Sequence, residues 1–442
     1  MQNKYDLIVY TSSSNPRLDY IIAIFFTKLL YLKAKITSDK DEFTKSDLGK
    51  INYSTHVFAC PCFTIIPHGL LAEKRIRPQT IYISQEHDLP VFFQTGSDSP
   101  DLSFDVLAMS FYLLTRYEEY LPFEADQHGR FTASQSLAYK EGFLETPLVN
   151  CWAKKIGELL QTKFSFLEPL QPWYQSVITY DIDIAWAYWN RSFFRTIGGI
   201  GRDLIKNPSK ATHRIKTFAG KKPDPFDTFA YIDAQHTHFF IPAQFFFLLG
   251  EYGQYDKNIH PDNPRLQQLI KAIKMKYHVG IHPSYASNDS QSQLQKEVEQ
   301  INAIIHTKVS DSRQHFLKLT FPKTYQQLIE LGIQRDYTMG YAEAIGFRAS
   351  MACPFLWFDL EKNESTDLTI YPFQVMDVTL KRYMKLDPET ANQEIKKMIT
   401  ACKSVGGTFI PIWHNSSLSD LDGWGEWRSV YEKMLKESIV GT

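Results

Sequence analysis

The chain has 442 residues, of which 43% are hydrophobic and 14% aromatic, and its formal net charge is -1. This length exceeds what one hydrophobic core usually serves, so we expect two domains. The near-neutral charge argues against a general nucleic-acid binder, because phosphate recognition needs a basic excess, and makes a small molecule or a sugar the more natural partner.

Signals for export, membrane insertion and disulfide formation are weak. The start, MQNKYDLIVYTSS, predicts a first strand rather than a secretion signal. The longest apolar stretch, residues 20–32, contains Lys28 and is too short to span a bilayer. The 5 cysteines show no metal-binding or disulfide spacing. We therefore expect a cytoplasmic protein without a transmembrane segment.

Residues 1–165 predict a small N-terminal α/β domain. We expect a strand at residues 7–10, a helix at 16–33 and two later helices at 105–120 and 148–160. The stretch 164–172 carries two prolines and few periodic residues, which makes it the expected domain boundary.

Residues 174–442 alternate short apolar runs with longer amphipathic segments. The expected strands are residues 176–182, 241–249, 279–282, 316–320, 368–378 and 408–413, and the expected helices are 265–276, 294–306, 325–331, 388–404 and 427–436. This alternation predicts a parallel sheet closed into a (β/α) barrel, where reactive groups gather at the C-terminal ends of the strands. Residues 191–222 are rich in Lys, Arg and Gly. We interpret them as a solvated insertion or as a lid that contacts an anionic group. The insertion is favoured, because runs of charged residues usually form solvent-exposed surface.

Two aspartates end the first strand of this second part, in TYDIDIAW at residues 179–186. Side chains two positions apart share a face of a strand, about 6.5–7 Å from each other, so Asp181 and Asp183 can face one pocket. Two close carboxylates are unfavourable unless a cation or a shared proton lies between them, which suggests one metal ligand and one base. The alternative is a pair of turn-forming aspartates.

Two later strands end in histidines. In YHVGIHPSY the glycine and the proline disfavour a helix, so His278 and His282 cannot share one ion, and only His282 is placed to bind a metal. In FIPIWHNSS the strand ends at His414, and an imidazole suits a general acid near neutral pH. Each histidine alone could equally be a hydrogen-bonded core residue, but the three strand ends together make a stronger case.

The order TYDID, GIHPSY and PIWHN resembles the polysaccharide deacetylases of carbohydrate esterase family four. The similarity covers residues 174–437 and includes PAQFFFLLGEY at 242–252. It is greatest to a bacterial branch with an extra N-terminal domain, in which PRLDY at 16–20 and RYEEYL at 116–121 look similar. The resemblance implies a distorted (β/α)7 barrel, preceded by the smaller α/β domain.

The resemblance also implies roles. Asp181 would be the general base, Asp183 and His282 would bind a divalent metal, and His414 would protonate the departing amine. Zn²⁺ is the metal we expect first, and Mn²⁺, Co²⁺ or Ni²⁺ also suit a histidine and carboxylate site. Ile182, inserted between the carboxylates, leaves open which aspartate takes which role.

The chain departs from the family at two motifs. The second metal-binding histidine falls on Ala286, so another group completes the site, or two protein ligands and water hold the metal, or the activity is lost. His315 and Asp336 are the candidates for a third ligand, unless they are a core histidine and a turn aspartate. The third-motif arginine is missing near Thr320. Arg348 could instead brace the base or contact substrate, or it could form a surface ion pair.

Aromatic side chains surround these motifs, and we expect Trp186 and Tyr285 to stack on a sugar face. The leading hypothesis is a metal-dependent deacetylase acting on an N-acetylated, or O-acetylated, sugar of a glycan or a glycan precursor. One alternative is a catalytically degenerate barrel that serves as a glycan-binding or assembly protein. Another is a hydrolase of a non-sugar amide.

Overall fold

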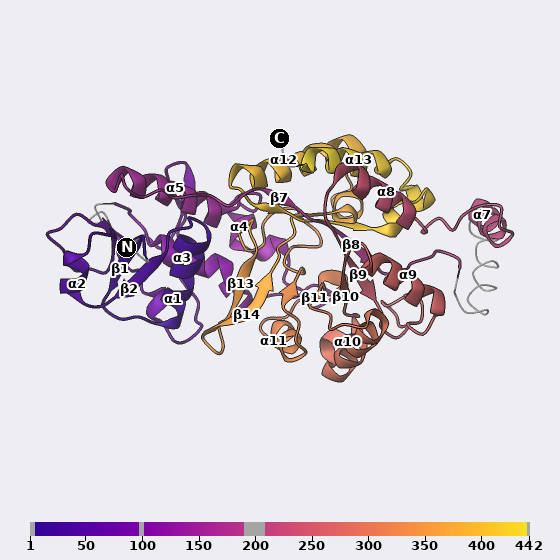
Figure 1. Ribbon diagram of the computed structural model, residues 1–442, viewed down its shortest axis with the longest axis horizontal. Coiled ribbons are helices and arrows are strands. Elements are labelled where there is room, and N and C mark those ends of the chain that lie inside the picture. The colour runs from indigo at the N-terminus through magenta and orange to yellow at the C-terminus, as the bar shows by residue number, and fades with distance from the viewer. Residues whose placement is uncertain (1–4, 97–100, 190–207, 440–442) are drawn as a thin grey trace.

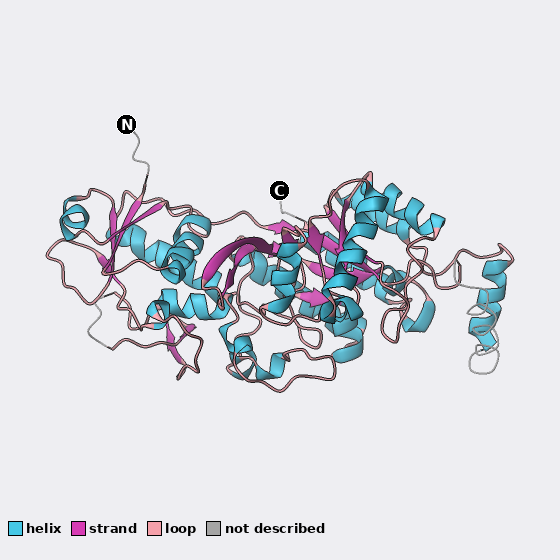
Figure 2. Ribbon diagram, turned by 90° about the horizontal axis from the view of Figure 1, so that it is seen from below, coloured by secondary structure: helices cyan, strands magenta, loops and turns pink. Residues whose placement is uncertain are grey.

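Two sheets from different parts of the chain organise the protein. The computed structural model describes residues 5–96, 101–189 and 208–439. A four-stranded sheet in the order β2-β1-β3-β4 comes from the N-terminal region, and a nine-stranded sheet comes from residues 178–414 (Figure 1). Figure 2 shows the same two groups of strands, separated along the long axis of the molecule. The structure is therefore a mixed α/β protein.

The N-terminal sheet is parallel throughout and is accompanied by helices. Its strands are β1 (Leu7–Thr11), β2 (Ala34–Thr37), β3 (Gly49–Tyr53) and β4 (Phe63–Thr64), and β5 (Ser84–Glu86) forms a separate antiparallel pair with β6 (Leu89–Val91). The helices are α1 (Pro16–Ile22), α2 (Lys40–Lys45), α3 (Val106–Leu114), α4 (Leu137–Lys140) and α5 (Leu148–Lys163).

Two predicted N-terminal helices change their winding before the predicted end. The first starts where predicted, because the Asn15 side chain caps it and Pro16 occupies its first turn, but it continues as the π-helix η1 (Ala23–Lys28). The second breaks at Arg116, whose φ of 53° leaves the helical region, and resumes as the 3₁₀ turn η3 (Tyr117–Tyr120).

The larger sheet has the order β13-β14-β12-β11-β10-β9-β8-β17-β15. All neighbouring strands in it are parallel except β13 and β14, which form an antiparallel hairpin. Its strands are β8 (Ile178–Ile182), β9 (Ala243–Leu248), β10 (His278–His282), β11 (Asp311–Ser312), β12 (Arg335–Asp336), β13 (Phe355–Asp359), β14 (Glu364–Ile370), β15 (Val375–Met376) and β17 (Pro411–His414). The C-terminal ends of the parallel strands therefore meet at one edge.

Helices lie on both sides of this sheet in Figure 1. They are α8 (Phe229–Phe239), α9 (Pro264–Lys274), α10 (Gln291–Ile305), α11 (Lys323–Glu330), α12 (Pro388–Ser404) and α13 (Trp427–Ser438), and a short pair joins β7 (Gln175–Ser176) to β16 (Thr408–Phe409). The helix α7 (Pro208–Phe218) lies apart at the right end of Figure 1. Of the predicted basic insertion, residues 191–207 lie outside the described residues.

The pairing of the strands does not confirm the predicted barrel. Within the described residues, β13 and β15 are the two edge strands of an open sheet and do not pair with each other. The predicted strand 368–378 is two strands, and the residues between them cross from one part of the sheet to another. There Tyr371 N donates to Asp336 O at 2.8 Å, and Gln374 N donates to Ile410 O at 3.4 Å.

The predicted strand at residues 316–320 is wrong. The chain turns there, with φ values of 59° at Phe316 and 54° at Leu317, and the strand of the sheet is the shorter β11 upstream. Positive φ values at two consecutive residues with side chains are incompatible with an extended strand.

The two sheets share one apolar core. Residues of α1, α3, the β13–β14 hairpin and the large sheet belong to the same buried cluster. The Tyr20 hydroxyl donates to Leu356 O at 2.7 Å, and the Phe111 and Phe358 rings lie 5.1 Å apart. Among the described helices, none combines the length and the apolar character that crossing a membrane requires.

Candidate active site

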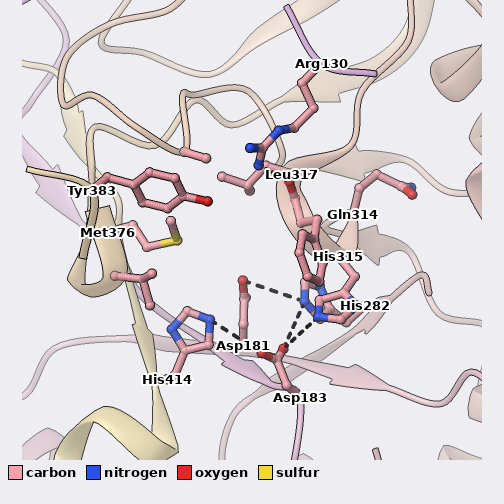
Figure 3. Close-up of a pocket in the computed structure, with 13 residues that line it drawn as sticks. Arg130, Asp181, Asp183, His282, Gln314, His315, Leu317, Met376, Tyr383 and His414 are labelled. Atoms are coloured by element: carbon pink, nitrogen blue, oxygen red, sulfur yellow. Dashed lines mark hydrogen bonds and ion pairs between the residues drawn. The ribbon is translucent and has the colours of Figure 1, made fainter. Parts of the chain in front are cut away.

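A cavity of about 160 Å³ opens at the C-terminal edge of the large sheet (Figure 3). Asp181, His282, Met376 and His414 come from the ends of β8, β10, β15 and β17. The full lining is Arg130, Asp181, Asp183, His282, Gln314, His315, Phe316, Leu317, Ala342, Met376, Val378, Tyr383 and His414.

Asp183 lies at the centre of three histidines. Its Oδ1 lies 3.3 Å from His282 Nε2 and 3.8 Å from His315 Nε2. Its Oδ2 lies 3.8 Å from His414 Nε2. In Figure 3 the dashed lines converge on this carboxylate, with His282 and His315 on one side of it and His414 on the other.

Hydrogen bonds fix which ring nitrogen of His282 and His315 faces Asp183. His282 Nδ1 lies 2.5 Å from Arg313 O, and His315 Nδ1 lies 2.8 Å from Asp256 Oδ1. A carbonyl and a carboxylate only accept hydrogen bonds, so each Nδ1 donates, and the neutral ring then turns a lone pair on Nε2 toward Asp183.

These donors fit a divalent cation. One ligand atom each from Asp183, His282 and His315 lie within 4.8 Å of one another. Asp183 Oδ1 is buried and has no hydrogen-bond partner among the residues that the structure describes. A buried carboxylate oxygen facing two lone pairs is costly unless a proton or a cation joins them. Two imidazoles and a carboxylate are a typical ligand set of catalytic zinc.

The electrostatics of the cluster keep Asp183 anionic. Burial alone would raise the pKa of Asp183, but the neighbouring His315, His282 and His414 lower it well below its ordinary value. Burial lowers the pKa of His282, but the negative charges of Asp181 and Asp183 raise it overall. The site therefore stabilises positive charge next to Asp183.

Asp181 is held by an arginine that the sequence analysis did not identify. Arg313 Nη1 donates to Asp181 Oδ1 at 2.9 Å and to Thr179 Oγ1 at 2.7 Å. Arg313 Nε donates to Tyr337 O at 2.9 Å, and the guanidinium is fully buried. The other oxygen of Asp181, Oδ2, lies 3.9 Å from His282 Nε2. Asp181 is thus fixed at the edge of the candidate metal site.

His414 is held by Asp377, which the sequence analysis also did not identify. Burial lowers the pKa of His414, but the charge of Asp377 and its hydrogen bond raise it overall to about 10. The ring is thus protonated at neutral pH, and because Nδ1 faces Asp377, the Nε2 proton points to the cavity. The sequence holds one signal that could have identified Asp377 as a site residue: it directly follows the apolar residues of β15.

The structure brings only one of the two candidate third ligands to this cluster. His315 joins it, whereas Asp336 is fully buried in β12 and accepts hydrogen bonds from Ser312 Oγ at 2.6 Å and Thr338 N at 2.9 Å. Asp256 links Ala286 to His315. Its Oδ1 contacts His315 Nδ1, and its Oδ2 accepts a hydrogen bond from Ala286 N at 3.4 Å.

The three predicted substrate contacts lie outside the cavity lining. Arg348 is buried and donates from Nε to Glu119 Oε1 at 2.9 Å, so it neither reaches Asp181 nor forms a surface ion pair. Trp186 is 7% exposed and packs in the core. Tyr285 is half-buried, with its ring 5.4 Å from that of Phe316, which does line the cavity.

Residues 7–165 match a family model described as a family of unknown function, DUF7033. No curated protein matches the chain. Among solved structures, the chain is similar to a provisionally named polysaccharide deacetylase from Mycobacterium smegmatis, at 14% identity and a TM-score of 0.39 over 59% of this chain and 84% of that one. It is also similar to Puue allantoinase (9% identity, TM-score 0.36, 59% and 82% covered).

A third similar structure is a CE4 family pseudoenzyme from Bacillus anthracis, at 11% identity and a TM-score of 0.29 over 61% of this chain and 66% of that one. All three TM-scores lie below 0.5. The activity of this chain therefore has to be argued from its own side chains.

Proposed function

We propose that this chain is a metal-dependent deacetylase that removes an acetyl group from an N-acetylated, or O-acetylated, sugar of a glycan or a glycan precursor. The observation that carries the proposal is the convergence of His282, His315 and His414 on Asp183, with the proton on Nδ1 fixed in each ring. The resemblance of residues 174–437 to polysaccharide deacetylases supports it and implies a distorted (β/α)7 barrel preceded by a smaller N-terminal domain at residues 1–165.

Asp183, His282 and His315 would hold the divalent cation, with Zn²⁺ expected first. When bound, such a cation supplies a Lewis acid that lowers the pKa of water and polarises an acetyl carbonyl. In this proposal His315 takes the role that the family gives to the histidine missing at Ala286. Asp256 orients His315 by accepting a hydrogen bond from its Nδ1.

The chain's own residues then move the protons. Asp181, oriented by Arg313, accepts a proton from the attacking water. His414, oriented by Asp377, donates its Nε2 proton to the departing amine or alkoxide oxygen. The acid and the base extend into the cavity from the neighbouring strands β17 and β8, so one acetyl group could contact both.

Elemental analysis of the purified protein, together with acetate release from a panel of acetylated saccharides, tests this proposal. We expect about one tightly held divalent ion per chain. Asp183→Ala, His282→Ala and His315→Ala should each lose the ion, whereas Asp181→Asn should keep the ion and lose turnover. Asp336→Asn, which changes the other candidate ligand, should keep the ion.

Each alternative has its own outcome. A chain that holds no ion even after loading would be a non-catalytic glycan-binding or assembly protein. Turnover of a cyclic amide or a formamide, without turnover of acetylated sugars, would make it a non-sugar amide hydrolase. If Asp181→Asn loses the ion, the two aspartates have the opposite roles.

A further inference from the structure

Arg130 is the one cavity-lining residue that comes from the N-terminal part of the described chain. All other lining residues lie between positions 181 and 414. Arg130 also falls within residues 7–165, which match the family of unknown function. In Figure 3 its guanidinium enters the cavity from the side opposite Asp181 and Asp183, and the Tyr383 hydroxyl extends toward it. The N-terminal part therefore supplies one wall of the cavity.

The guanidinium of Arg130 is held rigidly. Nε and Nη2 both contact Asp126 Oδ2, at 2.8 and 2.7 Å, and Nη1 donates to Phe316 O at 2.8 Å. The side chain is only 9% exposed. A guanidinium fixed in this way loses little conformational entropy when it binds a further group.

This arginine still has donors to offer. A guanidinium has more N–H groups than the contacts to Asp126, Phe316 and the Tyr383 hydroxyl use, and it has no acceptor. Asp126 is fully engaged, because its Oδ1 also accepts hydrogen bonds from the backbone N of His128 and of Arg130, at 2.8 and 2.9 Å. The open edge of the guanidinium therefore suits an oxygen acceptor on a ligand.

Charge and surface chemistry narrow the class of ligand. No other lysine or arginine appears among the described residues that line the cavity. Phe316 and Tyr383, which both contact Arg130, supply aromatic surface to the cavity lining. A planar guanidinium next to aromatic surface matches a sugar that carries a carboxylate or a phosphate.

We propose that Arg130, assisted by Tyr383, is a specificity residue that binds an oxyanion substituent of the sugar substrate. The N-terminal part of the chain thereby selects acidic over neutral sugars. The inference rests on the proposed function for the identity of the ligand as an acetylated sugar. It needs no turnover, so binding alone can test it.

Isothermal titration calorimetry of the metal-loaded full chain provides the test. The probes are N-acetylglucosamine, its 1-phosphate and 6-phosphate, and N-acetylmuramic acid, which adds a carboxylate to the same sugar. We expect at least one acidic probe to bind on the order of 10-fold tighter than N-acetylglucosamine, because charge-assisted hydrogen bonds are the strong ones. Which acidic probe binds tightest distinguishes a phosphate from a carboxylate.

Variants assign the preference to Arg130. Arg130→Gln should abolish the preference for acidic over neutral probes. Arg130→Lys should weaken this preference, because a lysine lacks the planar guanidinium that donates two parallel hydrogen bonds. Arg77→Gln is the matched control, since Arg77 pairs with Glu73 at the same i,i+4 spacing, but on the surface. This control should keep the full preference.

Equal affinity for acidic and neutral probes, or an equal loss of both in Arg130→Gln, would overturn the proposal. If Arg130→Gln does not fold, Tyr383→Phe takes its place, because Tyr383 is 44% exposed and its hydroxyl can be removed safely. An unchanged preference in Tyr383→Phe and in Arg130→Lys together would also overturn it. A failure of acetate release with an intact preference would instead count against the proposed function.

Discussion

Asp377 holds His414 by two contacts, one to the ring and one to the backbone. Asp377 Oδ1 lies 2.9 Å from His414 Nδ1, and Oδ2 accepts a hydrogen bond from His414 N at 2.8 Å. The carboxylate is 1% exposed, so it has no competing water. Ring orientation and charge at the acid end of the cavity therefore depend on one side chain.

Replacing Asp377 with asparagine should lower kcat about 10–100-fold, as removal of a residue that orients a site histidine typically does. The amide neither stabilises the imidazolium nor fixes its orientation. Metal content, measured by elemental analysis, should not change. Asp262→Asn is the control, because Asp262 pairs with His260 on the surface at 3.6 Å. Loss of the metal in Asp377→Asn would place His414 among the ligands and contradict its role as the acid.

Asp256→Asn should weaken metal binding about 10–100-fold, because Asp256 orients His315. Competition with a chelating indicator dye measures the change. Asp233→Asn removes a surface carboxylate that pairs with Lys276 and should leave affinity unaltered. Wild-type affinity in Asp256→Asn would mean that His315 is not a ligand.

Arg313→Met should destabilise the protein by about 3–5 kcal/mol, because it leaves the buried Asp181 carboxylate without its cation. Urea denaturation measures the free energy of unfolding. The double variant Asp181→Asn with Arg313→Met should recover part of that loss, since the uncompensated charge is gone. Strict additivity of the two changes would show that the pair is not coupled.

Glu119 predicts a stability that depends on pH. Glu119 Oε1 accepts hydrogen bonds from Arg116 Nε at 2.7 Å and Arg348 Nε at 2.9 Å. Burial would raise the pKa of Glu119, but Arg348 and Arg116 lower it below its ordinary value. A carboxyl whose pKa is lower in the folded than in the unfolded state stabilises the fold above the unfolded pKa, about 4.3, and loses this contribution as pH falls through the folded pKa.

Glu119→Gln should therefore lower the free energy of unfolding by about 3–5 kcal/mol near neutral pH, and by less in acid below about pH 4. Denaturation curves at both pH values measure this difference. Glu251→Gln breaks an exposed pair with Lys296 and should leave the free energy of unfolding nearly unchanged at both pH values. A cost for Glu119→Gln that does not fall with pH would contradict the assignment.

Local sequence predicted the parts of the site that depend on single strands. An apolar run followed by a polar residue marks the ends of β8, β10 and β17, and so Asp181, His282 and His414 were identified as candidates. The structure brings these three residues to one cavity. The helix α12 was predicted with the bounds that the structure gives it, because its period of apolar residues and the proline in its first turn are local signals.

The partners of these residues could not be predicted, because long-range packing places them. Arg313 follows β11, which has only the polar residues Asp311 and Ser312, and tertiary pairing with β10 and β12 makes it a strand. The apolar Leu317 and Leu319 suggested a strand at 316–320, yet Leu317 is buried in the 3₁₀ turn His315–Leu317 and Leu319 is buried just after it. Asp256 and Asp377 reach their histidines from 59 and 37 positions away in the sequence.

The β13–β14 hairpin couples the unfolding of the N-terminal part to that of the large sheet. Phe358 of this hairpin contacts Tyr20 and Phe111, with ring centroids 5.1 Å away in each case, and Arg17 Nε donates to Asn363 Oδ1 at 2.8 Å. Severing the polypeptide near residue 170 would leave these rings facing water on both fragments, which favours aggregation. The intact protein should accordingly melt in a single cooperative transition, and the N-terminal fragment produced on its own should be insoluble.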